Sequence, residues 1–590
     1  MAEIKTALAY FVKNLKQYWR ALFISLLLIL VATYAQIKAP LYLGDAISSL
    51  THYLVASLTP GGHGSLHDFY VAVFSMIAFY VLTEFALLIS GLMTAKISSD
   101  SVGVMRRGLF GKLQKMPVRY FDTHQDGKVL SLFTSDLDNI FTAMNNAVFQ
   151  IFSQALLFAG VIWMMFAKSA TMAWVTLAAT PIAIIGALLI AKYAQVQINH
   201  QQAATADMNG YINEQLAGQT VLLTEGRQAD SIEKFEPFNN QVRVASQKGQ
   251  FYSGLLNPLM QGFSLLNLAI VIFFGSWLVL HNGMDKASGL ALVVVFVNYS
   301  QQLFQPITSL TTIYNALQLA VTGANRITEV EKEDDEVNTG TKIAGPLKNE
   351  IALKHVDFAY NPDRQILKDV SITVKKGQMV ALVGPTGSGK TTVMNLLNRF
   401  YDLSGGEITY DGTKLQDFDL YSLRDRVGIV LQESVVFSKS IMDNIRYGRP
   451  DASLEEVQEA AKQARIHDFI MSLPDQYDTQ ISPEKDLFSS GQKQLLSIAR
   501  TILTDPDLLI LDEATSNVDT VTEAKIQEAM DNVMANRTSF VIAHRLKTIL
   551  SADQIVVLKD GRVIERGSHE ELVKENGFYA ELYTNQMVFE

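Results

Sequence analysis

Gly384-Pro385-Thr386-Gly387-Ser388-Gly389-Lys390-Thr391, in the second half of the chain, fits the pattern G-x-x-x-x-G-K-[ST] of the phosphate-binding P-loop. An apolar run at residues 379–383 precedes it and predicts a buried strand, and residues 392–397 follow it and predict a helix. The motif binds phosphate in this strand–loop–helix context. Glycines let the backbone wrap around the phosphates, so that the loop amides and the helix N-terminus point at the anion.

The loop residues have expected roles in binding a nucleotide. Lys390 would reach the β- and γ-phosphates, and the hydroxyl of Thr391 would bind Mg²⁺. The rest of the loop, together with Thr392, completes the predicted set of nucleotide contacts. The alternative is a chance glycine-rich turn, which leaves the flanking strand and helix unexplained.

Length and composition indicate a membrane protein with more than one domain. A chain of 590 residues is too long for a single core. It is 48% hydrophobic, and its mean hydropathy of +0.15 is high for a soluble protein. The net charge of −10 argues against a nucleic-acid partner. The absence of cysteine excludes disulfides, thiolate metal sites and cysteine nucleophiles.

The first half of the chain predicts an all-α membrane domain. Residues 1–19 place apolar side chains near one face at helical spacing, which predicts an amphipathic helix in the membrane interface. Residues 20–328 contain six apolar segments long enough to cross a bilayer. These segments lie near residues 20–43, 70–95, 141–166, 170–194, 256–280 and 288–318. The first is longer than a signal-peptide core, so we expect it to be retained.

The charges of the loops predict the orientation. The loop at 44–69 has no Lys or Arg, whereas the loop at 96–140 has several of both. By the positive-inside rule the second loop is cytoplasmic. We therefore expect a multi-pass protein of the cell membrane, with its N-terminus and its P-loop domain in the cytoplasm. Bends are expected in the cytoplasmic loops at 117–122 and 210–214.

Several polar and aromatic residues fall within the predicted spans. Glu84 could attract cationic substrates, because a carboxylate at that depth usually faces a cavity or a partner. The alternative is a protonated or hydrogen-bonded packing residue. Other polar side chains could line a pathway or only hold helices together; they are Asn145, Asn146, Gln150, Gln154, Asn298, Tyr299, Gln301 and Gln305. The aromatic residues that could contact substrate or only pack are Phe149, Phe152, Phe296 and Phe304.

A second domain follows a charged linker at residues 329–349. From 350 to 590, short β runs alternate with helices, which predicts an α/β domain with a largely parallel central sheet. Residues 508–513 form an apolar strand that ends in two acids. Asp512 is placed to hold Mg²⁺. Glu513 suits a base that polarises the attacking water, and the alternative for Glu513 is a cap of the following helix.

Together these segments resemble the ATP-binding cassette (ABC) exporters, in the half-transporter arrangement of six spans followed by one nucleotide-binding domain. The resemblance covers nearly the whole chain, and the motifs occur in the family order. It implies ATP and Mg²⁺ as cofactors and ATP hydrolysis coupled to transport. It implies that Tyr360 stacks on adenine, that Gln432 in the Q-loop contacts Mg²⁺ and the membrane domain, and that His544 contacts the γ-phosphate. Residues 516–519 would form the D-loop.

One motif departs from the family pattern. The family signature, Leu-Ser-Gly-Gly-Gln, binds the γ-phosphate of ATP that is held by the opposite domain. Here the motif is Phe488-Ser489-Ser490-Gly491-Gln492, in which Ser489, Gly491 and Gln492 are predicted nucleotide contacts. Ser490 adds a side chain where the backbone approaches the nucleotide. The preceding residues 482–485 also depart from the usual Gly-Glu-x-Gly.

This departure predicts a heterodimer. ATP sites of the family form between the P-loop of one chain and the signature of the other. The chain keeps Lys390, Glu513 and His544, and so resembles the subunit of a bacterial heterodimeric multidrug exporter that supplies the catalytic half of the competent site. The expected partner is a second half-transporter with a degenerate catalytic glutamate and an intact signature. The alternative is a homodimer in which Ser490 is neutral, because Gly→Ser is tolerated where φ is negative.

The predicted function is ATP-driven export of small hydrophobic, amphipathic or cationic drugs, in contact with membrane lipids. Segments 117–128 and 210–222 would transmit closure of the ATPase domains to the spans. A homodimeric lipid or peptide exporter and an ATP-gated channel or regulator remain as alternatives. The spans hold few cations beyond Lys38, which argues against a lipid A carrier, and an intact Glu513 and His544 argue against a channel that does not pump.

Overall fold

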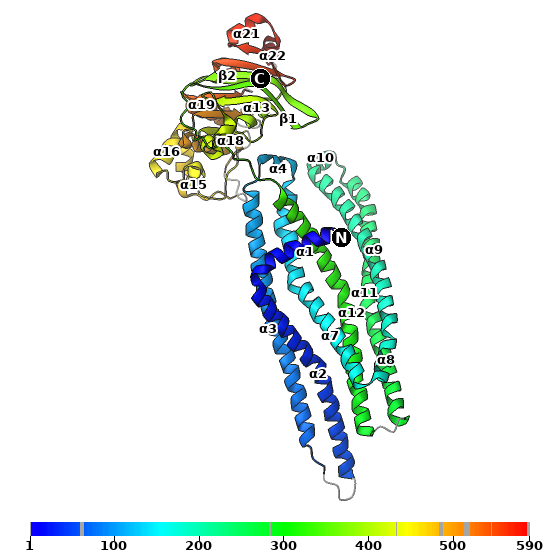
Figure 1. Ribbon diagram of the computed structural model, residues 1–590. Coiled ribbons are helices and arrows are strands. Elements are labelled where there is room, and N and C mark those ends of the chain that lie inside the picture. The colour runs from blue at the N-terminus through cyan, green and yellow to red at the C-terminus, as the bar shows by residue number, and fades with distance from the viewer. Residues whose placement is uncertain are drawn as a thin grey trace. The chain divides into compact units, whose positions relative to one another are not determined.

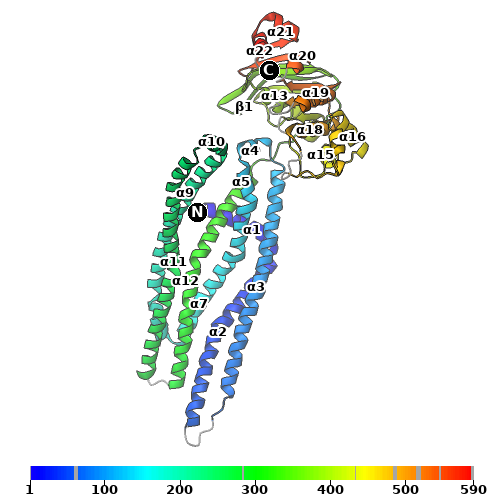
Figure 2. The ribbon, with the colours of Figure 1, turned by 180° about the vertical axis from the view of Figure 1, so that it is seen from behind.

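The computed structural model of the chain describes residues 2–58, 64–281, 285–431, 434–482, 488–512, 520–543 and 546–586. The chain forms two compact units, which Figures 1 and 2 show from opposite sides. The first unit comprises Met1–Gln114 and Gln125–Asp334, and the second comprises Lys115–His124 and Asp335–Glu590. Each unit is described by itself below.

The first unit is built of long helices. They are α1 (Ala2–Leu15), α2 (Trp19–Leu58), α3 (His67–Leu113), α5 (Asp126–Ser131), α6 (Leu137–Thr142), α7 (Val148–Lys168), α8 (Ala170–Ala178), α9 (Thr180–Ala217), α10 (Gln219–Thr224), α11 (Gln228–His281) and α12 (Lys286–Lys332). Within the described part of the chain, six helical runs are long and apolar enough to cross a membrane. These are Lys5–Leu58, His67–Leu113, Asp126–Lys168, Ala170–Ala217, Gln228–His281 and Lys286–Ile307.

Small residues bring neighbouring membrane helices close together. Between α2 and α3 the hydroxyl of Ser25 lies 2.8 Å from that of Ser90, and small side chains of this kind let helix backbones approach in a membrane. A Cβ added at Gly275 of α11 would lie 2.7 Å from the side chain of Val293 of α12. This contact sets the antiparallel register of α11 against α12.

The bend that we predicted at residues 210–214 is wrong. Helix α9 continues without interruption to Ala217, and the chain turns at Gly218, where the amide bonds to the carbonyl of Glu214 at 3.0 Å. One glycine inside a long helix costs only about 1 kcal/mol relative to alanine. Gly210 therefore stays helical. Helix α12 likewise extends to Lys332, into the first residues of the predicted linker.

The described residues of the second unit form two sheets. The four-stranded antiparallel sheet has the order β2-β1-β4-β5, and the six-stranded sheet has the order β10-β9-β3-β8-β7-β6. The strands are β1 (Glu350–Asn361), β2 (Arg364–Lys375), β3 (Met379–Val383), β4 (Gly405–Tyr410), β5 (Thr413–Lys414), β6 (Val427–Val430), β7 (Leu508–Asp512), β8 (Thr538–Ile542), β9 (Gln554–Lys559) and β10 (Arg562–Gly567). Strands β9, β3, β8, β7 and β6 are parallel, as we predicted for the central sheet. The antiparallel sheet was not predicted.

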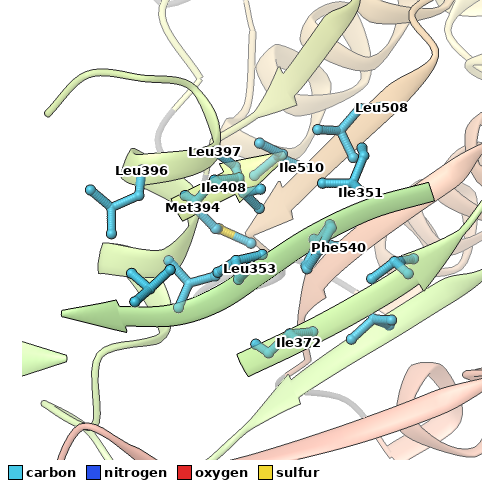
Figure 3. Packing of buried hydrophobic residues seen from close by; sticks show 14 of the residues in the cluster. Ile351, Leu353, Ile372, Met394, Leu396, Leu397, Ile408, Leu508, Ile510 and Phe540 are labelled. Atoms are coloured by element: carbon cyan, nitrogen blue, oxygen red, sulfur yellow. The ribbon is translucent and has the colours of Figure 1, made fainter. Parts of the chain in front are cut away.

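Helices cover these sheets and complete the core of the second unit. The helices are α4 (Val118–Thr123), α13 (Lys390–Leu397), α14 (Leu420–Arg424), α15 (Ile441–Ile445), α16 (Leu454–Gln463), α17 (His467–Ser472), α18 (Ser490–Thr504), α19 (Thr520–Met534), α20 (Leu546–Ser551), α21 (His569–Glu575) and α22 (Phe578–Gln586). Figure 3 shows how Leu353 and Ile372 of the antiparallel sheet pack near Met394 of α13 and Phe540 of the parallel sheet. One apolar cluster thus joins both sheets to α13. The predicted fold class, an all-α six-helix membrane domain followed by an α/β P-loop domain, is confirmed.

Candidate nucleotide-binding site

The P-loop lies between the carboxyl end of β3 and the first turn of α13. Its backbone takes angles that favour glycine, with φ of +82° at Gly387 and +103° at Gly389. A Cβ at Gly384 would lie 2.1 Å from the carbonyl oxygen of Leu558, so no larger residue fits there. The hydroxyl of Ser388 is buried without a hydrogen-bond partner among the described residues. A buried hydroxyl with unmet capacity suits a phosphate oxygen.

Lys390 is buried at the start of α13. Its ammonium group donates to the carbonyl oxygen of Gly384 at 2.7 Å and to that of Pro385 at 3.1 Å. Burial lowers the pKa of Lys390, and the negative charge of Asp512 acts in the opposite direction. This cation is therefore held over the loop, where it can bind the phosphate that the amides surround.

Asp512 and Thr391, two of the predicted metal ligands, lie at the same edge of the six-stranded sheet. Asp512 ends β7 and is in register with Ile542 of β8, which is in register with Leu382 of β3. Thr391 belongs to the first turn of α13, directly after the loop that follows β3. Carboxylate and hydroxyl oxygens are ligands that Mg²⁺ uses together with water and phosphate. These residues therefore fit a magnesium nucleotide.

Tyr360, the predicted adenine contact, belongs to an aromatic cluster near the P-loop helix. Its ring meets those of Phe358 and Tyr401 edge to face, with centroids 4.8 and 4.9 Å apart. Its hydroxyl donates to Thr392 Oγ1 at 3.3 Å and accepts from Asn395 Nδ2 at 3.2 Å. The cluster fixes the ring beside α13. We did not predict Phe358, Tyr401 or Asn395 as part of the site, because these residues lie outside the recognised sequence motifs.

The segment around α4, which the chain inserts between α3 and α5, also contacts this cluster. Arg119 Nη2 donates to the backbone carbonyl of Tyr360 at 3.4 Å, and the Tyr401 hydroxyl donates to the carboxylate of Asp122. Burial and the negative charge of Asp122 raise the pKa of Tyr401, so its hydroxyl remains a donor. The predicted coupling segment 117–128 thus begins beside the predicted adenine contact.

The altered signature lies at the N-terminus of α18. Phe488 is buried against Phe469, with ring centroids 5.5 Å apart. Ser489 caps the helix: its hydroxyl accepts from the amide of Gln492, and the side chain of Gln492 accepts from the amide of Ser489. Ser490 is the first helical residue and is exposed. A 15-residue helix therefore presents its N-terminus, with the added side chain, at the surface of the unit.

The other predicted site residues lie outside the described residues. They are Gln432, Glu513 and His544, together with the D-loop at 516–519. In the sequence they follow β6, β7 and β8, which are parallel strands of the sheet that carries the P-loop. The carboxyl ends of parallel strands share one edge, and ligands of α/β sheets bind at that edge.

The structure also places the polar and aromatic candidates of the spans. Glu84 is exposed on α3, without a hydrogen bond or ion pair among the described residues. Tyr299 is fully buried and donates to the carbonyl of Ile37 at 2.9 Å, and Phe296 and Phe304 are also buried. These three aromatic residues therefore pack the interior of the unit in this structure.

Comparison with known proteins agrees with the fold. Residues 22–319 match the family model of the ABC transporter transmembrane region, and residues 367–516 match the family model described as ABC transporter. A fatty acid ABC transporter ATP-binding/permease protein of Mycobacterium bovis is 37% identical over 481 residues, which are 81% of this chain and 75% of the relative. A probable multidrug resistance ABC transporter ATP-binding/permease protein of Bacillus subtilis, YheH, is 34% identical over 492 residues, which are 82% of this chain and 72% of the relative.

A solved structure shares the fold across both units. It is a bacterial Atm1-family ABC exporter with ATP bound, with a TM-score of 0.76 and 27% sequence identity. The match covers 96% of this chain and 98% of the other.

Proposed function

The chain belongs to the ABC transporter family, as an exporter that couples ATP hydrolysis to transport, and we propose that it is one subunit of a heterodimeric pump for hydrophobic, amphipathic or cationic compounds. The multi-pass domain would lie in the cell membrane with the ATPase domain in the cytoplasm. The similarity to YheH, which carries a multidrug name, supports this class of substrate.

The competent ATP site would use this chain for its catalytic half. Lys390 and the loop amides bind the phosphates, and Tyr360 positions the adenine. Thr391, Asp512 and Gln432 would hold Mg²⁺, which neutralises charge on the phosphates. Glu513 would polarise the attacking water and His544 would contact the γ-phosphate. Phosphoryl transfer to water depends mainly on positioning and charge stabilisation, which this arrangement supplies.

The proposal of a heterodimer rests on the altered signature. Ser490 projects from the first turn of α18, where the backbone amides of the family approach a nucleotide held by the other chain. Its side chain occupies space that a glycine leaves open. We infer that this signature faces a degenerate site, while the P-loop of this chain pairs with an intact signature of the partner.

A homodimeric exporter of lipids or fatty acids is the second candidate. Ser490 is helical, and serine is compatible with the negative φ of a helix. The relative from Mycobacterium bovis is named as a fatty acid transporter. In this case the signature would be a harmless variant.

A measurement of ATPase activity distinguishes the heterodimer from the homodimer. The chain is purified alone and together with a co-expressed candidate partner. Each preparation is measured with and without Glu513→Gln in this chain. Activity that appears only with the partner, and that Glu513→Gln abolishes, supports one competent site in a heterodimer. Full activity from the chain alone would overturn the heterodimer.

A further inference from the structure

The polypeptide passes from one unit to the other at three points, near the ends of α3, α4 and α12. The first and the third of these points are bonded to each other on both sides. In the first unit the ammonium group of Lys112 donates to the carbonyl of Glu333. In the second unit the amide of Glu336 donates to the carbonyl of Lys115 at 2.7 Å. We call the first and third points the paired crossings.

The predicted linker is folded onto the ATPase unit directly after the third point. The side chain of Asn338 donates to the carboxylate of Asp419 at 2.9 Å. A Cβ added at Gly340 would overlap the backbone carbonyl of Phe418, so no larger residue fits there. This part of the linker is therefore not a slack tether. A movement of the surface on which it lies also moves the linker.

The side chain of Glu336 is held by Arg424 of α14. Arg424 Nη1 donates to Glu336 Oε2 at 2.9 Å, and Arg424 Nη2 donates to Glu336 Oε1 at 2.7 Å. The side chains of Arg424 and Glu336 are only 27% and 22% exposed. Two parallel bonds between a guanidinium and a carboxylate fix their relative orientation, and partial burial reduces screening by salt. The pair is therefore a defined attachment of the linker.

Arg424 also caps the carboxyl end of the P-loop helix α13. Its Nε donates to the carbonyl of Asn398 at 3.3 Å, and its Nη2 donates to that of Arg399 at 3.1 Å. Its guanidinium carbon lies 5.3 Å from the centroid of the Phe400 ring. A cation is favoured at the carboxyl end of a helix, where carbonyls lack partners within the helix. One guanidinium thus joins Glu336 to the helix whose other end carries the P-loop.

A second arginine ties the same helix end to the linker. Arg399 is buried and has a φ of +52°, which is uncommon for a residue other than glycine. Its guanidinium donates to the carbonyl of Val337 at 3.4 Å and to that of Phe418 at 3.3 Å. A backbone of this kind persists where its surroundings hold it in place. The end of α13 therefore has a fixed position against the linker.

We propose that Glu336 and Arg424 are positioning residues that transmit a movement of the P-loop helix to the paired crossings. Phosphate binds at the N-terminus of α13, and a helix of eight residues, about 12 Å long, moves as one body. Its displacement carries Arg424 and Glu336 with it, and the amide of Glu336 carries Lys115. This route enters the membrane unit through the chain itself, apart from the predicted coupling segments at 117–128 and 210–222. It applies to a homodimer as well as to a heterodimer.

Hydrogen exchange measured by mass spectrometry tests the route. The full-length exporter, with its partner chain where ATPase activity requires one, is placed in nanodiscs with and without ATP and orthovanadate. Peptides covering residues 106–114 and 325–334 report on the membrane-unit side of the paired crossings. A peptide covering residues 210–226 reports on the other predicted coupling segment. In the parent protein we expect the nucleotide to change exchange in all three peptides.

Matched variants assign the response to the pair. Glu336→Gln removes the charge at constant size, and Arg424→Lys keeps the charge but cannot form the two parallel bonds. Each should reduce the nucleotide-dependent change at 106–114 and 325–334 at least about twofold and leave that at 210–226 as in the parent. The double variant should be no worse than either single one, because both act through the same bonds.

Asp417→Asn is the control. It breaks the ion pair of Asp417 with Lys342, 3.1 Å long, on the same linker, and leaves the end of α13 untouched. Its exchange should match that of the parent. The Kd for the fluorescent analogue TNP-ATP should stay within about twofold of the parent value in all variants, because none of them alters a predicted nucleotide contact. The Tm should fall by only a few degrees, since the pair is partly exposed.

Four outcomes would overturn the proposal. The first is a parent protein that shows no response to nucleotide at the paired crossings. The second is an undiminished response there in Glu336→Gln. The third is an equal loss in all three peptides, or a large fall in Tm, which would make Glu336 and Arg424 merely structural. The fourth is an equal loss in Asp417→Asn, which would assign the effect to the linker as a whole.

Discussion

The hydroxyl of Tyr401 donates a hydrogen bond to the carboxylate of Asp122, and the ring of Tyr401 meets that of Tyr360 edge to face at 4.9 Å. Tyr401 thus connects the segment between α3 and α5 to the predicted adenine contact, and Arg119 of that segment also donates directly to the backbone carbonyl of Tyr360. If a nucleotide that stacks on Tyr360 displaces its ring, the displacement is transmitted to α4 by these direct contacts.

Tyr401→Phe should weaken the stimulation of ATP hydrolysis by the transported substrate. The change removes the bond to Asp122 but keeps the aromatic ring, so we expect ATP to bind normally and substrate to stimulate hydrolysis a few-fold less. The measurement is ATPase activity with and without a transported drug. Tyr410→Phe is the matched control, because the Tyr410 hydroxyl bonds to the carbonyl of Gly345 instead. Equal losses in both variants would contradict the coupling role.

Tyr360 should contribute mainly through its ring. Tyr360→Ala removes the stacking surface, and we expect the KM for ATP to rise about tenfold, since base–aromatic stacking is worth about 1–3 kcal/mol. Tyr360→Phe loses only the bonds to Thr392 and Asn395, and its KM should stay within about threefold of the parent value. Steady-state ATPase titrations compare the two. If Tyr360→Phe were as impaired as Tyr360→Ala, the hydroxyl and not the ring would be the important group.

Ser490→Gly should raise the ATPase activity of the proposed heterodimer at least twofold, because it restores the glycine of the family signature. Ser490 is exposed at the first turn of α18, so the free energy of unfolding should change by no more than about 0.5 kcal/mol. Ser490→Ala keeps the Cβ and should behave like the parent. An unchanged rate in Ser490→Gly would show that the serine is neutral.

Asp136 and Arg326 should stabilise the membrane unit as a pair. Arg326 Nη1 lies 2.7 Å from Asp136 Oδ2, and the Arg326 guanidinium also donates to Ser131. Arg326→Met leaves a buried carboxylate unpaired and should cost about 2 kcal/mol, less than for a fully buried pair because the Arg326 side chain is 37% exposed.

The double variant Asp136→Leu/Arg326→Met should recover most of that stability, which thermal unfolding in detergent can measure. The exposed pair Arg227–Asp230 provides the control, and Arg227→Met should have little effect. Additive losses in the double variant would mean that the two side chains act independently.

Glu84→Gln should reduce transport of cationic drugs several-fold and spare neutral ones. Glu84 is exposed on α3 among apolar side chains and has no partner in the part of the chain that the structure describes, and a carboxylate of this kind at membrane depth is suited to meet a cation. Uptake into inside-out vesicles measures both classes. An equal loss of transport for cationic and neutral drugs would mean that Glu84 acts in the assembly of the proposed dimer and not in recognition of the cation.

The fold followed from local patterns, whereas much of the site did not. The strand, the loop and the helix around Lys390 are adjacent in the sequence, so one short motif predicts all three. The long apolar runs predict membrane helices, because few other structures accommodate so many consecutive apolar residues. The bond between Asp122 and Tyr401 joins residues with an apolar domain and a linker between them in the chain, and no periodicity marks such a contact. The buried polar residues Thr180, Asn267 and Ser300 were not predicted, because they are single polar residues on three separate helices. Each by itself is typical of helix packing.

Helix α3 runs through 47 residues, His67–Leu113, without a proline. At 1.5 Å per residue it is about 70 Å long, more than twice the roughly 30 Å hydrocarbon core of a bilayer. A straight rod of this length acts as a lever: a tilt of about 5° displaces one end relative to the other by about 6 Å, close to one helical turn. A large motion at one end of α3 then requires only a small rotation about its other end, and α3 itself does not have to bend or unwind.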